Sequence, residues 1–152
     1  MGTHRRESRL LRSTTHHGGK VTFSYLSHLW IDREDGSGLV RLTANKARDL
    51  TPRFSPDGQR LALDILTDKQ RDIWVYDWPR DTLTQLTFDP SYEQAPGWTP
   101  DGRPIVFASD RAKAGIATLS EMNADGPGEI VRSTQSDKSK GPGTGHPSRK
   151  FT

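Results

Sequence analysis

The chain has 152 residues, no cysteine, 14 glycines, 10 prolines and a hydrophobic fraction of only 31%. This composition excludes disulfides and thiolate metal sites, and it is typical of an all-β chain built from short strands and many turns. The formal net charge of +3 is uneven: residues 1–20 carry five Arg or Lys against Glu7, residues 132–152 carry five against Asp137, and the part between them is acidic.

The first predicted segment, residues 1–19, is a basic arm that we expect to be disordered. It lacks the apolar stretch of a secretory signal, and no apolar run in the sequence reaches membrane-spanning length. As it stands, the sequence predicts a cytoplasmic protein with no membrane partner. We also expect no nucleic-acid partner, because basic ends on an acidic body do not make the clustered cationic face that phosphates require.

Residues 20–43 are predicted to form the last three strands of a four-stranded antiparallel unit. The expected strands are 20–25, 28–32 and 39–43, and the segment 35–38 supplies a hairpin turn between the last two. No strand is predicted before Lys20. The sequence therefore predicts that this unit lacks its first strand.

The following residues contain an internal repeat with an offset of 44 residues: Leu42-Thr43 recurs at Leu86-Thr87, the segment 52–58 at 96–102, and the apolar segment 61–63 at 105–107. A repeat of about 40–45 residues has the length of one β-propeller blade. Each repeat holds a predicted tight turn, since Pro presets one dihedral and Gly accepts a positive φ. These structural turns are Pro56, Asp57, Gly58 and Pro100, Asp101, Gly102.

The strands of the second and third units follow from the repeat and its turns, from alternating apolar and polar residues over 59–64 and 103–108, and from strand propensity over 72–77. In chain order they are 53–55, 59–64, 72–77, 82–87, 97–99, 103–108, a weaker echo at 116–119, and 129–132. Residues 133–152 are rich in Ser, Gly, Lys and Pro, and we expect them to be disordered. The predicted fold class is therefore all-β: an incomplete β-propeller of about two and a half four-stranded antiparallel blades, over 20–43, 51–87 and 95–132, between disordered termini.

The repeated residues resemble the TolB-type, WD-like propeller repeat. The similarity rests on Leu-Thr, then Pro-x-Phe/Trp-Ser/Thr-Pro-Asp-Gly, then Ser109-Asp110-Arg111 and Ile73-Trp74-Val75-Tyr76. The segment 17–25, followed by Leu29-Trp30, is especially similar to the opening of tricorn-type propellers, and propellers appended to bacterial kinases share the pattern. The resemblance covers roughly residues 20–132. It implies the fold and assigns no catalytic residue, because the shared positions are turns and core residues.

Residues that could carry catalysis are few. His16 and His17 lie in the basic arm without a second metal-spaced pair, and His28 opens a predicted strand. No Gly-x-Ser-x-Gly elbow occurs, and the glycine-rich segment 141–145 neither follows a strand nor opens a helix. The catalytic residues are therefore left unassigned.

Four aspartates are the candidate metal ligands, because they flank predicted strand ends, where the loops of a propeller gather at one mouth: Asp64, Asp68, Asp72 and Asp110. Calcium takes six to eight oxygen ligands, which carboxylates and loop carbonyls supply. The alternative interpretation of these residues is a solvated, charged rim.

Two functions compete on this evidence. The first is a non-catalytic binding or scaffold module with a small-molecule or protein ligand. The second is a calcium-dependent hydrolase that opens lactones or esters, such as acyl-homoserine lactones, on a metal-polarised carbonyl. A further hypothesis is that the chain is a fragment whose reading frame breaks near Arg132. Because closed propellers need about four to eight blades and open sheet edges pair with other chains, we expect self-association or a missing propeller portion as partner.

Overall fold

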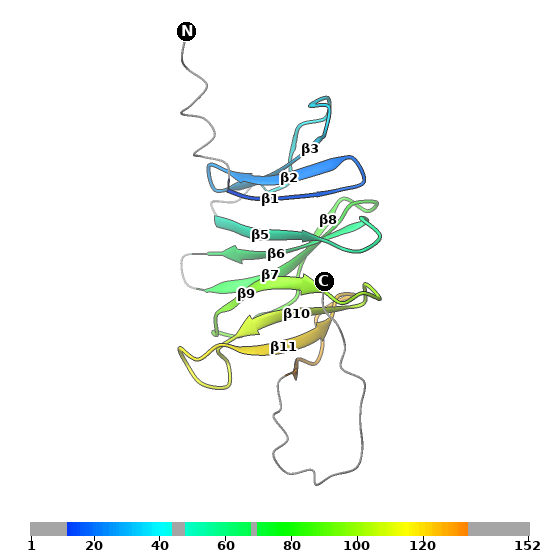
Figure 1. Cartoon of the computed structure of the whole chain (residues 1–152). Helices are drawn as coiled ribbons and strands as arrows, with labels where there is room; N and C mark the ends of the chain where they lie inside the picture. The colour runs from blue at the N-terminus through cyan, green and yellow to red at the C-terminus, as the bar shows by residue number, and fades with distance from the viewer. Residues whose placement is uncertain (1–11, 44–47, 68–69, 134–152) are drawn as a thin grey trace.

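The computed structural model describes residues 12–43, 48–67 and 70–133, and none of these residues lies in a helix. They form three four-stranded antiparallel sheets, stacked one upon another from the N-terminal to the C-terminal part of the chain (Figure 1). The stack is not closed into a ring. The predicted fold class, an all-β incomplete propeller, is therefore confirmed.

Each sheet is one blade, and its strands follow one another in chain order. Blade 1 consists of β1 (Arg12–His17), β2 (Lys20–Tyr25), β3 (His28–Arg33) and β4 (Val40–Arg41). Blade 2 consists of β5 (Arg48–Phe54), β6 (Arg60–Leu66), β7 (Arg71–Asp77) and β8 (Thr82–Gln85). Blade 3 consists of β9 (Glu93–Trp98), β10 (Pro104–Ser109), β11 (Thr118–Asn123) and β12 (Val131–Arg132). The first strands of the blades lie together, because β5 contacts both β1 and β9.

The first blade has the strand that the sequence analysis left out. β1 pairs antiparallel with β2, with His17 opposite Lys20 and Thr15 opposite Thr22. The prediction that blade 1 lacks its first strand is therefore wrong, and so is disorder for the part of residues 1–19 that β1 occupies. The turn between β1 and β2 is the two-residue Gly18-Gly19, where the other blades have a longer Pro-Asp-Gly segment, so the repeat does not reveal it.

The third strand of blade 3 also lies away from its predicted position. The structure places β11 at Thr118–Asn123, whereas the weaker sequence echo was at 116–119. A loop over 110–117 separates β10 from β11 and contains two turn hydrogen bonds, from Lys113 N to Asp110 O and from Ile116 N to Lys113 O. This loop moves the third strand out of the 44-residue offset. The expected disorder of 134–152 lies outside the described residues.

Two apolar cores hold the three blades together. Leu29 of blade 1 packs with Leu61, Leu63, Ile65 and Tyr76 of blade 2. On the other face of the same sheet, the second core combines four residues of blade 2 with five of blade 3: Ala62, Ile73, Val75, Leu86, Trp98, Ile105, Phe107, Met122 and Ala124. Side chains alternate between the two faces of a strand, so blade 2 contributes to both cores.

The repeated sequence motifs make the same hydrogen bonds in successive blades. Ser55 Oγ donates to Asp57 at 2.6 Å and Thr99 Oγ1 donates to Asp101 at 2.5 Å, while Gly58 and Gly102 both have a φ of 68°. The Leu-Thr motif follows the fourth strand of blades 1 and 2, and its threonine hydroxyl binds the backbone of the third strand. Thr43 Oγ1 accepts from the backbone N–H of Leu29 and Thr87 Oγ1 from that of Ile73, both at 2.9 Å. The repeat is thus a repeat of backbone-capping side chains as well as of apolar residues.

Candidate functional site

The largest group of buried ionisable side chains lies between blades 2 and 3, beside the first strands of both blades. These strands carry a bulge at the same place in the repeat: the pairing register shifts in β5 and in β9, and Thr51 and Ala95 have positive φ values of 36° and 53°. Such backbone is strained for residues other than glycine and must be held by its surroundings. Asp64 contacts both bulges, and the other side chains interact with Asp64 or with one another near the start of β9. We name this set the interblade cluster: Asp64, Arg71, Asp72, Glu93, Gln94, Ser109 and Arg111.

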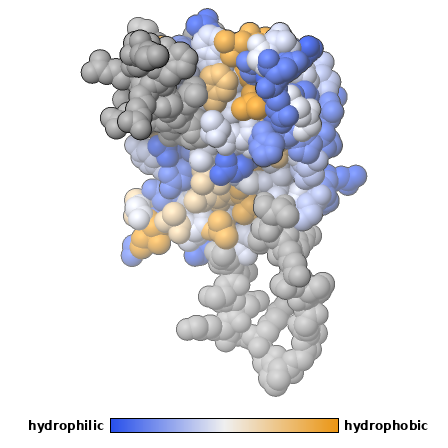
Figure 2. All heavy atoms as spheres, turned by 45° about the horizontal axis from the view of Figure 1, so that its top comes forward, coloured by the Kyte–Doolittle hydropathy of each residue, from blue (hydrophilic) through white to orange (hydrophobic). Residues whose placement is uncertain are grey.

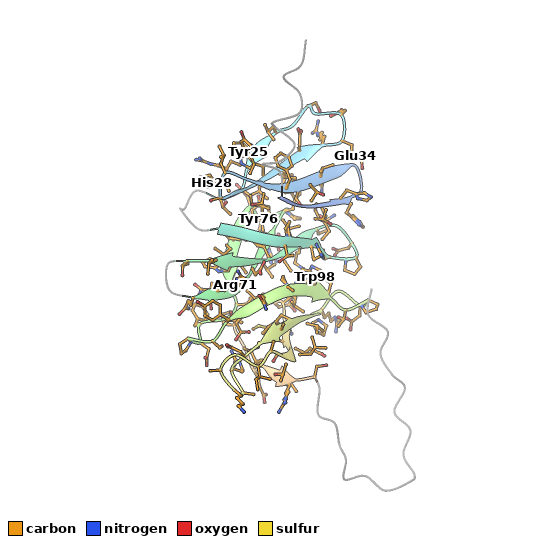
Figure 3. All side chains as sticks on the ribbon, turned by 60° about the vertical axis from the view of Figure 1, so that its left-hand side comes forward. Tyr25, His28, Glu34, Arg71, Tyr76 and Trp98 are labelled. Carbon is orange, nitrogen blue, oxygen red and sulfur yellow. The ribbon has the colours of Figure 1, made fainter. Side chains whose placement is uncertain are left out.

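Asp64 connects the two bulged strands. It is only 1% exposed, and it accepts hydrogen bonds from Thr51 Oγ1 at 2.6 Å and from the backbone N–H of Ala95 at 3.4 Å. Arg71 Nη1 lies 3.8 Å from Asp64 Oδ2 and donates to Gln94 Oε1 at 2.7 Å. Figure 3 shows Arg71 on the side of the stacked blades opposite Trp98. A blade 2 carboxylate thus fixes the backbone of blade 3.

Asp72 is buried to the same degree, and its hydrogen-bond partners among the described residues are neutral. Its carboxylate accepts from Gln70 Nε2 at 2.7 Å and from Thr87 Oγ1 at 3.2 Å. Burial raises the pKa of Asp72 above its ordinary value, and the negative charges of Glu93 and Asp89 raise this pKa further. Asp72 therefore ionises less readily than an ordinary aspartate.

Glu93 is the most enclosed carboxylate, with 0% exposure. Its Oε1 atom accepts from Ser91 Oγ at 2.7 Å, from Ser109 Oγ at 3.0 Å and from Arg111 Nη2 at 2.8 Å. The pairing with Arg111 is a charge-assisted hydrogen bond, which compensates the cost of burying the charge. Within the described part of the chain, the other oxygen, Oε2, is buried without a hydrogen-bond partner.

Asp110 lies apart from these residues and organises a loop. It accepts hydrogen bonds from the backbone N–H groups of Tyr92 at 2.8 Å and Gly115 at 3.1 Å, and these bonds hold the pKa of Asp110 below its ordinary value. Asp68, the fourth aspartate of the predicted calcium site, lies outside the described residues. The structure therefore does not bring the described aspartates to one point.

The burial of Asp64 and Asp72 bears on both interpretations of the aspartates. A solvated rim is wrong for Asp64 and Asp72, which are each 1% exposed and lie within β6 and β7 rather than in loops. Among residues 12–43, 48–67 and 70–133, no three His, Cys, Asp or Glu side chains gather so that they could hold a metal ion. The calcium site stays a prediction, to be tested by calcium titration.

His16, His17 and the turn residues do not join the interblade cluster. The ring of His17 lies 5.9 Å from that of Phe54 in the next blade, and His16 is exposed on β1. Asp57 of the first turn accepts from Ser55 Oγ and from the backbone N–H of Gln59, and both bonds lower its pKa. Pro56, Gly58, Pro100, Asp101 and Gly102 form the corresponding hairpin turns at the end of each blade opposite the interblade cluster.

Sequence reasoning missed Arg71, Glu93 and Arg111, which supply most of the charge of the interblade cluster. Arg71 and Asp64 are seven positions apart on paired strands, and Glu93 and Arg111 are joined across a β-hairpin. In the sequence, each of these three residues is a charged residue at the margin of an apolar strand segment, which is only a weak signal for a buried cluster. Strand pairing within a blade forms each pair, and the packing of blades 2 and 3 joins the pairs through the hydrogen bond from Arg71 to Gln94, which no local sequence pattern encodes.

The comparisons with known proteins agree with this geometry. Residues 8–140 match the family described as the tricorn protease N-terminal beta propeller domain. The chain belongs to this family. It is also similar to an uncharacterized peptidase YuxL of Bacillus subtilis, with 33% identity over 86 residues, covering 55% of this chain and 13% of the relative. Tricorn protease homolog 1 of Streptomyces coelicolor is 30% identical over 100 residues, covering 65% of this chain and 9% of that protein.

Solved structures show the same tricorn-type propeller fold. The crystal structure of the tricorn protease superimposes with a TM-score of 0.68 at 21% identity, covering 77% of this chain and 12% of that one. A putative TolB from Agrobacterium tumefaciens gives a TM-score of 0.63 at 21% identity, covering 76% of this chain and 45% of that one. This chain thus spans a small part of its relatives' length. The described residues contain no helix long and apolar enough to cross a membrane.

Proposed function

We propose that this tricorn-type propeller segment is a non-catalytic binding and scaffold module that works within a larger peptidase-like protein. The observation that carries this proposal is the use of the interblade cluster: its buried charged groups bind the backbone of a neighbouring blade or one another. Asp64 fixes the bulge at Ala95, and Glu93 joins Ser91, Ser109 and Arg111. The peptidase names of the relatives support the larger context.

The arrangement of hydroxyl groups in the interblade cluster also favours a structural role. A nucleophilic serine needs a neighbouring base that accepts its proton. Ser91 and Ser109 both donate to Glu93 Oε1, which also accepts from the Arg111 guanidinium. The same carboxylate oxygen is thus occupied by both hydroxyls and by a guanidinium, as in a structural hydrogen-bond network. These hydroxyls therefore stabilise the carboxylate rather than attack a substrate.

The same proposal identifies the partner as a further portion of the propeller. Three blades fall short of the roughly four to eight that close a ring. The outward face of blade 3 carries Leu119, which is 41% exposed, and Val131, which is 56% exposed. Seen from the blade 1 side, the surface is mostly polar with separate apolar patches (Figure 2). A further blade packed face to face on blade 3 would cover Leu119 and Val131.

The proposal is tested by assaying the purified chain for hydrolysis of fluorogenic peptides, esters and lactones, each with added calcium and with a chelator. We expect no turnover in any condition, and unchanged thermal stability with calcium. Turnover that remains with the protein through purification and falls in an Asp64→Asn or Glu93→Gln variant would contradict the proposal. Calcium-dependent lactone turnover would favour the lactonase alternative, which the peptidase names of the relatives do not support.

A further inference from the structure

The interface between blades 2 and 3, which we call the joint between these blades, contains a hollow and a bridging arginine. A hollow of about 290 Å³ lies there, walled by blade 2 residues and closed by the turn after β11, at Ala124, Asp125 and Gly126. Arg60, the first residue of β6, reaches across this joint. Its guanidinium lies 2.9 Å from Asp125, 4.8 Å from the centroid of the Trp98 ring, and donates to the carbonyl of Gly102. The guanidinium of Arg60 on blade 2 thus pairs with the acidic turn of blade 3.

The joint between blades 1 and 2 repeats this arrangement. Lys20 is the first residue of β2, as Arg60 is of β6, and each pairs with the last residue of the following strand, Arg33 and Asp77 respectively. The ammonium of Lys20 lies 5.0 Å from the centroid of the Trp78 ring, in the turn after β7. In both joints, a cation at the start of the second strand contacts the turn after the third strand of the next blade.

Blade 3 has the same hollow on its outward face, with a volume of about 430 Å³. The strand pairing shows that equivalent positions line the two hollows. Arg60, Val75 and Thr84 of blade 2 correspond, in this order, to Pro104, Glu121 and Val131 of blade 3. The cation of the other joints is replaced by Pro104. Asp101, Glu121 and Glu129 stand around the blade 3 hollow, against Arg103. The blade 2 residues that line its hollow include two cations and one anion, whereas those of blade 3 include three anions and one cation.

We propose that the blade 3 hollow binds the turn after the third strand of a further propeller blade, and that this turn carries Lys or Arg. The inference rests on the proposed function, in which more of the propeller packs onto blade 3. The internal repeat identifies what enters the hollow, because the equivalent hollow of blade 2 holds such a turn. The acidic surroundings identify its charge, since like charges brought together in an interface are repulsive.

The charge also argues against a second copy of this chain as the occupant. In a head-to-tail dimer, blade 1 of the second copy would pack onto blade 3, and its turn after β3 begins with Glu34, Asp35 and Gly36. This turn would bring two carboxylates to a hollow that already holds Asp101, Glu121 and Glu129. An interface that juxtaposes like charges selects against that partner.

The test uses the whole chain and two synthetic hairpins with the sequence of residues 118–132, cyclised to hold the turn. One hairpin keeps Asp125 and the other carries Asp125→Lys, so they differ only in the charge at the turn. Binding is measured by calorimetry at low and high salt. We expect the lysine hairpin to bind about tenfold more tightly at low salt, because repulsion is replaced by attraction. The difference should shrink at about 1 M salt, where the Debye length is near 3 Å.

Two chain variants locate the binding. Glu129 is exposed, so Glu129→Lys should leave the fold intact, as urea unfolding would verify, and it should remove or reverse the preference for the lysine hairpin. The matched control Glu34→Lys, on blade 1, should keep the preference. If both hairpins bound with equal affinity and Val131→Asp weakened both, the inference that the bound turn carries Lys or Arg would be overturned. The proposed function would then still stand. Exclusion of both hairpins by a concentration-dependent dimer would overturn the inference in favour of a second copy.

Discussion

Asp72 is the residue whose surroundings oppose its charge most clearly. It is 1% exposed, its hydrogen-bond donors are the neutral side chains of Gln70 and Thr87, and Glu93 adds a like charge. The raised pKa means that the folded protein holds the proton of Asp72 more tightly than the unfolded chain does. The free energy of unfolding therefore loses a contribution as the pH rises from about 3.8, the ordinary value, through the folded-state pKa.

This linkage gives a prediction for Asp72→Asn. On acidification from neutral pH toward pH 4, the wild-type chain should gain stability relative to the variant, because only the wild type takes up the extra proton. Urea unfolding of both chains at several pH values measures the difference. Comparison with the variant removes the opposite effect of Asp35, Asp57 and Asp110, whose lowered pKa values reduce stability as the pH falls through the acid range. A difference that is constant with pH would contradict the prediction.

Arg60 is the residue on which the outer side of the blade 2–3 joint depends. Arg60→Ala removes a cation–π contact with Trp98, a hydrogen bond to Gly102 and the ion pair with Asp125. We expect a loss of about 1–2 kcal/mol in the free energy of unfolding. Arg80→Ala is the matched control: the side chain of Arg80 is 79% exposed and pairs only loosely with Asp77, so its loss should stay within about 0.5 kcal/mol. Equal losses would show that Arg60 does not hold the joint.

At the scale of the element, the two Pro-Asp-Gly turns form a natural pair for comparison. Gly58 and Gly102 have the same φ of 68°, a backbone conformation that is unfavourable for residues other than glycine. A Cβ on Gly102 would meet Pro56 at an ordinary 3.5 Å, whereas one on Gly58 would overlap Cδ2 of the His17 ring. Gly102→Ala should therefore cost about 1 kcal/mol in unfolding free energy and Gly58→Ala clearly more.

The cause of that difference can be isolated with His17→Ala. In the background of this variant, the cost of Gly58→Ala should fall to that of Gly102→Ala, because only the unfavourable φ remains. A thermodynamic cycle of the four chains, measured by urea unfolding, gives the coupling between the two positions. No coupling would mean that the His17 ring moves aside without cost.

The elements that the sequence predicted well are those with a local signal. β2 alternates apolar and polar residues, whereas β6, β7 and β10 are rich in apolar residues, and the predicted ranges of all four agree with the structure to within two residues. β1 was missed because its sequence, Arg-Ser-Thr-Thr-His-His, has no apolar residue, and pairing with β2 and contact with β5 keep it in place. The interblade cluster was found only in part, through Asp64 and Asp72. Its other members become visible once strands of different blades are packed together.

At the scale of the whole molecule, the three blades form a linear array with two interfaces. Such arrays gain stability from each unit and from its contacts with nearest neighbours. Blade 2 has a core on both faces, whereas blades 1 and 3 each share one core. Amide hydrogen exchange should therefore be slowest in β6 and β7 and faster in β2, β3, β10 and β11. Similar protection in all three blades would mean that the chain unfolds as one cooperative unit.

A core substitution at one end of the array tests this picture directly. Leu29 is 0% exposed and is the blade 1 member of the core that blade 1 shares with blade 2, so Leu29→Ala should cost about 2–5 kcal/mol locally. Because this core does not include blade 3, exchange should accelerate in β2 and β3 while β10 and β11 keep their protection. Phe107→Ala, in the core between blades 2 and 3, should give the opposite pattern. Faster exchange in all three blades with either substitution would show that the two interfaces are coupled through blade 2, and that the chain behaves as one domain despite its open ring.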